Sequence, residues 1–153
     1  MNIIEGKLIG KGYKVAIVAS RFNSIIVGRL IEGAVDSFTR HGIESDDIML
    51  YKVPGAFEIP MAISRLLRKS EFDGILSLGA IIRGETPHFD YIANEVSKGV
   101  AQLALTSDIP ISFGVLTTDT TEQAIQRAGS KMGNKGFSAA AALIEMINLY
   151  KQF

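Results

Sequence analysis

The clearest chemical signal in the sequence is the run Arg83-Gly84-Glu85-Thr86-Pro87-His88. A glycine and a hydroxyl residue just ahead of a predicted helix are typical of an anion site, because backbone N–H groups are free at a helix N-terminus. His88 falls in the first helical turn, where the dipole disfavours the imidazolium, so that a neutral imidazole can relay protons. The alternative, a surface or capping histidine, is less favoured because the anion motif lies next to His88 in the sequence. The run therefore predicts an anion site beside a proton-transferring group.

Two other turns carry residues suited to a planar, hydroxylated ligand. Phe22 lies in the turn Ser20–Asn23, where its ring can stack on a planar ligand or simply attach the next helix to the core. We interpret Asn23 as a helix cap. The stretch Pro54–Pro60 contains two prolines and a glycine that fix an unusual backbone path, so its amides can bind polar ligand atoms. Glu58 can accept hydrogen bonds from hydroxyl groups, or serve as a first-turn acid favoured by the helix dipole.

Basic residues gather near the C-terminal glycines. Arg127, Lys131 and Lys135 are spaced by four, so they can neutralise a phosphate or form an ordinary solvated face. Phe113 lies inside a predicted strand and by its type belongs to the core. His41 follows a predicted helix C-terminus, where the dipole favours a cation, and we interpret it as structural.

The elements that position these residues alternate between the apolar spacing of strands and that of helices. Short apolar runs typical of buried parallel strands are separated by segments of helical periodicity. The predicted strands are Lys14–Ser20, Asp47–Val53, Asp73–Arg83 and Ile111–Thr118. The predicted helices are Asn23 or Ser24 to Arg40, Ala56–Lys69, Pro87 to about Thr106, Glu122–Ala128 and Phe137–Tyr150. Residues 129–136 are predicted to form a turn. This order predicts an α/β fold, a three-layer α/β/α sandwich with a flavodoxin-like, four-stranded parallel sheet and right-handed crossovers. Ligands of such sheets bind beyond the carboxyl ends of the strands, where the turns described above lie.

Both ends of the chain point to self-association. Asn2–Glu5 can form a strand, but Gly6, Gly10 and Gly12 separate it from the rest, so we expect it to join the sheet of a neighbouring subunit. The last helix is apolar around much of its circumference, which is typical of a helix buried on more than one side.

Composition limits the function classes. The length of 153 residues suits one domain, residues 1–153, since typical domains hold roughly 100–200 residues. Equal numbers of basic and acidic residues, 16 each, disfavour a nucleic-acid partner and permit self-association. The sequence has no cysteine and only two histidines, so we expect no disulfide, no thiolate catalysis and no metal. No uncharged stretch approaches the ~18 residues of a membrane helix, and no secretory signal is evident, so we expect a cytoplasmic protein without membrane contact.

Taken together, five stretches resemble the lumazine synthase family, which catalyses the penultimate step of riboflavin biosynthesis. They occur in the family's order and span nearly the whole chain: Ser20–Asn23, Val53–Pro60, Ile82–Tyr91, Phe113–Thr117 and Arg127–Gly136. The resemblance implies a transferase that condenses 5-amino-6-(D-ribitylamino)uracil with 3,4-dihydroxy-2-butanone 4-phosphate. The products are 6,7-dimethyl-8-ribityllumazine, phosphate and water, and no cofactor or metal takes part.

The resemblance also implies a role for each site residue. His88 is the general acid and base. The ribitylaminouracil is bound by Phe22, Ala56, Phe57, Glu58, Ala80, Ile81, Ile82, Phe113 and Lys135, and the butanone phosphate by Glu85, Thr86 and Arg127. Phe113 and Arg127 are expected from the adjacent subunit. A carboxylate would repel phosphate, so we expect Glu85 to contribute its backbone N–H with its side chain turned away.

The resemblance further implies a homopentamer, and in some members a hollow icosahedral shell of 60 subunits. Members that stop at pentamers often carry insertions before the last helix, and the short turn Gly133–Gly136 here favours the shell. Riboflavin synthase is a candidate partner inside such a shell. Two other interpretations stay open: a flavodoxin-like module that binds flavin without catalysis, and a shell-forming scaffold that has lost its chemistry. The neutral charge and the absence of a Ser/Thr-rich loop after the first strand disfavour the flavin module.

Overall fold

A four-stranded parallel sheet forms the centre of the computed structural model, which describes residues 1–153. Its strands are β1 (Val15–Ser20), β2 (Ile48–Val53), β3 (Gly74–Ile82) and β4 (Ile111–Thr118), in the order β2-β1-β3-β4. The inner strands β1 and β3 are buried almost throughout, as their continuous apolar runs predict. The parallel register is unbroken along all three strand pairs. The predicted four-stranded parallel sheet is confirmed.

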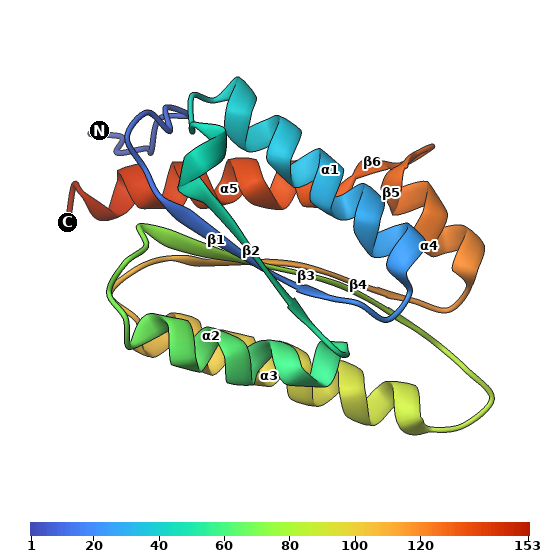
Figure 1. Ribbon diagram of the computed structural model, residues 1–153. Coiled ribbons are helices and arrows are strands. Elements are labelled where there is room, and N and C mark those ends of the chain that lie inside the picture. Colours follow the sequence, from blue (N-terminus) through green and yellow to red (C-terminus); the bar gives the residue numbers. More distant parts are fainter.

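Helices cover both faces of this sheet, so the predicted three-layer sandwich is also confirmed (Figure 1). One face carries α1 (Ser24–Arg40), α4 (Thr121–Arg127) and α5 (Lys135–Tyr150), and the other carries α2 (Ile59–Leu67) and α3 (His88–Thr106). Two separate apolar cores result, one on each side of the sheet. α5 packs against both the sheet and α1. Its wide apolar surface is therefore largely buried within its own chain, without a neighbouring subunit.

Several element boundaries differ from the prediction. The predicted helix Ala56–Lys69 opens as a 3₁₀ turn, η2 (Ala56–Glu58), before α2 begins, and another 3₁₀ turn, η1 (Ser45–Asp47), precedes β2. Pro87 lies just outside α3 instead of in its first turn. The predicted turn 129–136 is wrong in detail, because it contains a two-stranded hairpin of β5 (Ala128–Ser130) and β6 (Gly133–Asn134), and α5 starts at Lys135.

The early start of α5 has a local cause in Asn134. Its side-chain oxygen accepts a hydrogen bond from the backbone N–H of Phe137 at 3.1 Å, which caps the helix. Its amide group donates to the carbonyl of Arg29 in α1 at 2.9 Å. A Cβ on Gly136 would collide with the carbonyl oxygen of Leu30, so only glycine lets the first turn of α5 lie this close to α1.

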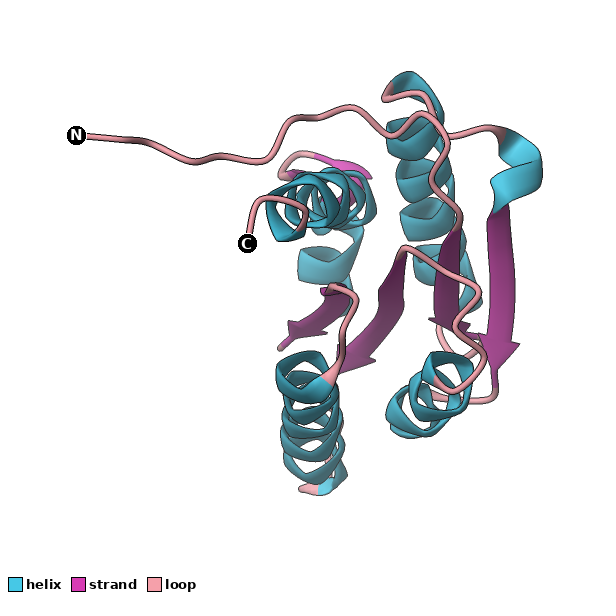
Figure 2. Ribbon diagram, turned by 90° about the vertical axis from the view of Figure 1, so that its left-hand side faces the viewer, coloured by secondary structure: helices cyan, strands magenta, loops and turns pink.

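The N-terminal segment Asn2–Glu5 forms no strand within its own chain and extends away from the body of the molecule (Figure 2). The residues that follow it are fixed along α5, where Asn148 donates to the carbonyls of Lys7 and Ile9 at 2.7 and 2.9 Å. Gln152 likewise donates to the carbonyl of Glu5 at 2.8 Å. The added strand in a neighbouring subunit stays a prediction. No helix in the chain is both long and apolar enough to cross a membrane.

Candidate active site

A cavity of about 700 Å³ opens at the carboxyl edge of the sheet, where the turns after β1, β2 and β3 meet. It is lined by Phe22, Asn23, Gly55, Ala56, Phe57, Glu58, Ala80, Ile81, Ile82, Gly84, Thr86, His88, Phe89 and Ile92. Most of the residues that the sequence singles out therefore share one cavity, as the strand-end rule predicts. We call this cavity the pocket.

The turn after β1 places Phe22 at the rim of the pocket. The Phe22 side chain is 73% exposed, so it is not part of the core and its ring is free to stack on a ligand. The backbone N–H groups of Arg21 and Phe22 donate to the carbonyls of Val53 and Pro54 at 2.8 and 3.2 Å. These bonds join the turn after β1 to the turn after β2, so the two walls that they form are held together.

Asn23 precedes α1 but does not cap it with its side chain. Its backbone is left-handed, with φ of 59°, and its side chain makes no capping hydrogen bond to α1. Its amide instead donates to the carbonyl of Ala80 at the end of β3, at 2.8 Å. The interpretation as a cap alone is wrong, because asparagine tolerates this conformation and its side chain then reaches a neighbouring strand.

Glu58 is anchored from its own turn. One carboxylate oxygen accepts a hydrogen bond from the N–H of Gly55 at 2.9 Å, so the Glu58 side chain reaches back to the start of η2. This is the helix-start role that the sequence left open as an alternative. The same bond fixes the carboxylate at the wall of the pocket, where its second oxygen can accept a further hydrogen bond.

The segment after β3 supplies Thr86 and His88. Both side chains line the pocket, and His88 is the first residue of α3. Glu85 is exposed and does not line the pocket. An anion here would meet the N-terminus of a 19-residue helix together with a threonine hydroxyl.

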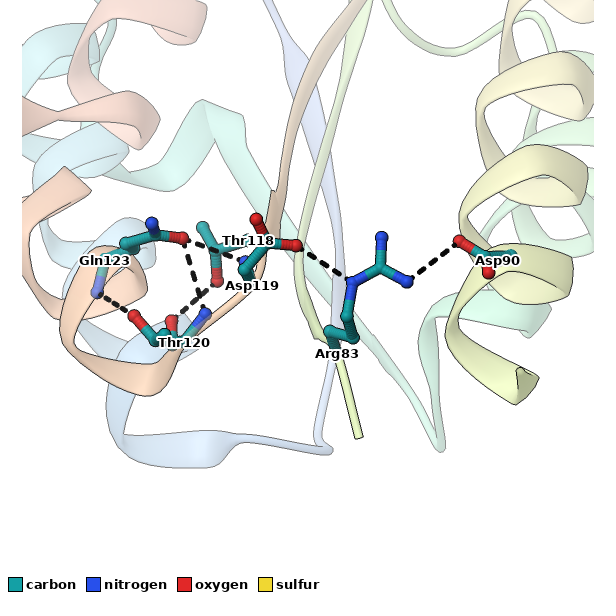
Figure 3. Close-up of polar contacts among 6 residues, drawn as sticks. All are labelled: Arg83, Asp90, Thr118, Asp119, Thr120 and Gln123. Atoms are coloured by element: carbon teal, nitrogen blue, oxygen red, sulfur yellow. Dashed lines mark hydrogen bonds and ion pairs between the residues drawn. The ribbon is translucent and has the colours of Figure 1, made fainter. Parts of the chain in front are cut away.

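Arg83 stands just ahead of this segment and ties it to its neighbours (Figure 3). Its guanidinium donates to Asp119 through Nε at 2.9 Å and to Asp90 through Nη1 at 3.4 Å. It also lies over the ring of Phe89, 4.5 Å from the centroid. The hydrogen bond to Asp119 and the two carboxylate charges raise the pKa of Arg83, so the guanidinium stays charged.

Four predicted site residues lie outside the pocket: Glu85, described above, and Phe113, Arg127 and Lys135. Arg127 and Lys135 line a second cavity of about 620 Å³ on the α1 side of the sheet, together with Asp36. Arg127 donates to the carbonyl of Gln123 at 3.1 Å, within α4. Phe113 is half-buried and packs against the core on the α2 side. One chain therefore does not bring Arg127 and Thr86 together, and we call the second cavity the basic cavity.

Sequence reasoning missed several residues of the site. Asn23 was interpreted only as a cap, and Arg83, Phe89 and Ile92 were given no role. The signal for Phe89 and Ile92 was available, because helical spacing places both on the apolar face of α3, which packs against the core on the α2 side. No sequence pattern indicates that Arg83 meets Asp119, since these residues are 36 positions apart.

Comparison with known proteins matches nearly the whole chain. Residues 12–151 match the model of the 6,7-dimethyl-8-ribityllumazine synthase family. Proteins named 6,7-dimethyl-8-ribityllumazine synthase from Nautilia profundicola and Chloroherpeton thalassium are each 58% identical to this chain, and one from Campylobacter jejuni is 56% identical. Each alignment covers 99% of this chain and 99% of the relative. The pocket and the basic cavity both lie inside the matched range.

Proposed function

Because this chain belongs to the 6,7-dimethyl-8-ribityllumazine synthase family, we propose that the pocket is the place where it performs the family's reaction. The protein is a transferase of riboflavin biosynthesis. It condenses 5-amino-6-(D-ribitylamino)uracil with 3,4-dihydroxy-2-butanone 4-phosphate to give 6,7-dimethyl-8-ribityllumazine, phosphate and water. The observation that carries the proposal is the convergence of three separate turns on one cavity that holds an aromatic ring, a carboxylate and an imidazole.

The pyrimidine substrate lies against the apolar side of the pocket. Phe22 stacks on its ring, and the exposed ring at the rim supports this role. The backbone of Ala80–Ile82 reads the uracil edge, while Ala56–Glu58 holds the ribityl chain. The fixed carboxylate of Glu58 accepts a hydrogen bond from a ribityl hydroxyl through its second oxygen.

The phosphate of the second substrate binds at the start of α3. Thr86 and the backbone N–H of Glu85 contribute donors, and the helix N-terminus favours the negative charge. Arg127 supplies the neutralising cation from the adjacent subunit, which also contributes Phe113, and Lys135 completes the site. A shared site is supported by the fact that Arg127 and Thr86 of one chain line two different cavities.

His88 moves the protons of the reaction. The pyrimidine's free amine attacks the butanone carbonyl and the adduct loses water to give an imine. Phosphate then leaves, the ring closes on the ribitylamino nitrogen, and a second water is lost. Each step transfers protons that one positioned imidazole can relay, which is worth about 10²–10⁴-fold in rate. Holding two small reactants together supplies about 7–11 kcal/mol, so positioning contributes the larger share.

The assembly completes the site. We propose a homopentamer in which Asn2–Glu5 joins the sheet of the next subunit, and a 60-subunit shell in which riboflavin synthase can be enclosed. The exposed Ile3 and Ile4 support the first step, because an isolated apolar segment is stabilised by a partner sheet. The short hairpin before α5 supports the shell, because family members that stop at pentamers often carry insertions there. Light scattering at working concentration separates a monomer, a pentamer and a shell by mass.

The activity is tested by mixing the purified protein with both substrates and following lumazine fluorescence. Product must appear with stoichiometric release of phosphate, and loss of either substrate must abolish the signal. Absence of product with both substrates present, from protein that light scattering shows to be assembled, would contradict the assignment.

The shared site is tested by co-expressing two variants, His88→Ala and Arg127→Ala. If the two residues act across an interface, about a quarter of the interfaces in randomly mixed rings hold both intact residues, and activity recovers to that extent. If both residues serve one subunit's own pocket, verified mixed rings show no recovery above the two variants alone.

A further inference from the structure

Arg83 and Asp90 bracket the segment that holds the proposed phosphate site. Arg83 follows the last residue of β3, and Asp90 lies in the first turn of α3. The guanidinium of Arg83 reaches back over this segment to the Asp90 carboxylate at 3.4 Å and to the ring of Phe89. One side chain therefore closes the loop from the strand end to the helix start, with Thr86 and His88 between its two ends.

The loop itself has little else to hold it. Among the backbone hydrogen bonds of turns and loops, none involves residues 84–86. The nearest such bonds lie at its ends, from the N–H of Arg83 to Thr118 and from the N–H of Asp90 to Pro87. A Cβ on Gly84 would meet no atom within 4 Å, and residues 83–88 are all exposed. The Arg83 side chain therefore joins the two ends of an exposed loop.

The other partner of Arg83 is itself firmly placed (Figure 3). The backbone N–H groups of Asp119 and Thr120 both donate to the side-chain oxygen of Gln123, at 2.9 and 3.3 Å. The hydroxyl of Thr120 accepts from the N–H of Gln123 at 3.1 Å, which completes a capping box at the start of α4. The backbone that carries Asp119 is therefore held at the neighbouring strand end, and its carboxylate, with 68% of the side chain exposed, accepts from Arg83 Nε at 2.9 Å.

We propose that Arg83 is a positioning residue for the condensation, because it holds the loop 84–87 against β4 and α3 and so places Thr86 and His88 for the butanone phosphate. The inference rests on the proposed function of those two residues. Arg83 does not itself line the pocket, and Ala80–Ile82, which read the uracil edge, are held in β3 by their pairing with β4. We therefore expect the effect of Arg83 to fall on the phosphate substrate and on the proton-transfer step.

A direct role would give a different pattern. If Arg83 bound the phosphate itself, Asp119 and Asp90 would compete with that phosphate for the guanidinium, and removing either carboxylate would leave binding unchanged or strengthen it. If Arg83 positions the loop, removing Asp119 has the same effect as removing Arg83. Lysine would keep the charge but lack the planar fork that donates in two directions and covers the Phe89 ring. Lysine therefore rescues a phosphate ligand better than a positioning residue.

The experiment compares Arg83→Ala, Arg83→Lys, Asp119→Ala and the double variant Arg83→Ala/Asp119→Ala with the wild type in the full assembly. Both KM values and kcat are measured by lumazine fluorescence. We expect each single variant to lower kcat about 10-fold and to raise KM for the butanone phosphate, because a small misplacement of reacting groups has effects of this size. We expect KM for the pyrimidine to stay within about twofold and the double variant to be no worse than Arg83→Ala.

Arg68→Ala is the control. Arg68 is an exposed arginine at the end of α2 whose side chain makes no ion pair and lines neither the pocket nor the basic cavity. Its kinetics should equal those of the wild type. Exposed ion pairs add little to stability, so all variants should fold, and thermal unfolding at a fixed protein concentration verifies this.

Four outcomes would overturn the inference. Wild-type or improved phosphate KM in Asp119→Ala, or full activity in Arg83→Lys, would exclude positioning through Asp119. His88→Ala is assayed in parallel: unchanged kcat there would refute the proposed role of His88 and the inference with it. Reduced kcat in His88→Ala with wild-type kinetics in Arg83→Ala and Asp119→Ala would refute only the role of Arg83.

Discussion

The pocket and the basic cavity have similar volumes but opposite chemistry. The pocket, of about 700 Å³, is lined mainly by aromatic and aliphatic groups with one carboxylate and one imidazole. The basic cavity, of about 620 Å³, is lined by Arg127 and Lys135, with Asp36 as its one acidic group. A reaction between a planar ring and a phosphorylated ketone requires both kinds of surface. One chain contains both but holds them apart, which fits a site completed by a second copy.

The two regions also differ in how they are held. The basic cavity borders a hairpin whose Asn134 both caps α5 and bonds to α1, and Gly136 lies directly against the α1 backbone. The pocket borders the loop 84–86, which has no backbone hydrogen bond of its own. The basic groups thus lie on a hydrogen-bonded frame, whereas the groups proposed to move protons lie at the end of a loop. Loops that carry reacting groups commonly belong to the less stable parts of a fold.

The largest effect is expected from the imidazole of the pocket. His88→Ala should lower kcat about 10²-fold, the lower end for the loss of one general acid–base group, because positioning of the two substrates remains. Steady-state lumazine fluorescence measures it. Complete loss of activity would mean that His88 does more than relay protons, and an unchanged rate would exclude the relay.

On the basic side, Arg127→Ala should raise KM for the butanone phosphate by roughly 10–100-fold, since a hydrogen bond to a charged group contributes about 1.5–3 kcal/mol. KM for the pyrimidine should change little, because the pyrimidine carries no phosphate. Equal increases in both KM values would contradict the division of labour between the two cavities. The control is Lys131→Ala, which removes an exposed cation of the same region that lines neither cavity.

At the rim of the pocket, Phe22→Ala should weaken pyrimidine binding about 10-fold, within the ~1–3 kcal/mol of a base–aromatic stack. Isothermal titration calorimetry with the pyrimidine alone measures this directly. Phe22→Tyr keeps the ring and serves as the control. An affinity unchanged in Phe22→Ala would assign the ring no part in binding.

The smallest effect concerns the frame of the basic cavity. Asn134→Ala removes a helix cap and the link to α1, and should lower the free energy of unfolding by about 1 kcal/mol. Gly84→Ala, where an added Cβ meets nothing, should leave this free energy unchanged. Urea unfolding at one fixed protein concentration compares the two. If both variants have the same free energy of unfolding, the hairpin beside the basic cavity is held no more firmly than the loop 84–86.

Much of the site was predictable because strand ends can be located from apolar runs. β1, β2 and β3 were placed to within about a residue, and the rule that ligands bind at carboxyl strand ends then selected the turns that carry Phe22, Glu58 and His88. Continuous apolar runs are a reliable signal for β1 and β3, since both are buried almost throughout. Thr86 and His88 share the pocket because both lie in the segment that follows the end of β3.

What the sequence by itself determined was the order of the elements, the parallel sheet with helices on both faces, and the chemical character of each turn. These depend on interactions between near neighbours, which residue type and spacing encode. The tertiary structure decided which turns meet: that Asn23 bonds to Ala80 instead of capping its helix, that Arg83 reaches Asp119, and that Arg127 lies on the far side of the sheet from Thr86. Such contacts join residues that are tens of positions apart, and their geometry follows from strand order and layer packing, which no local pattern records.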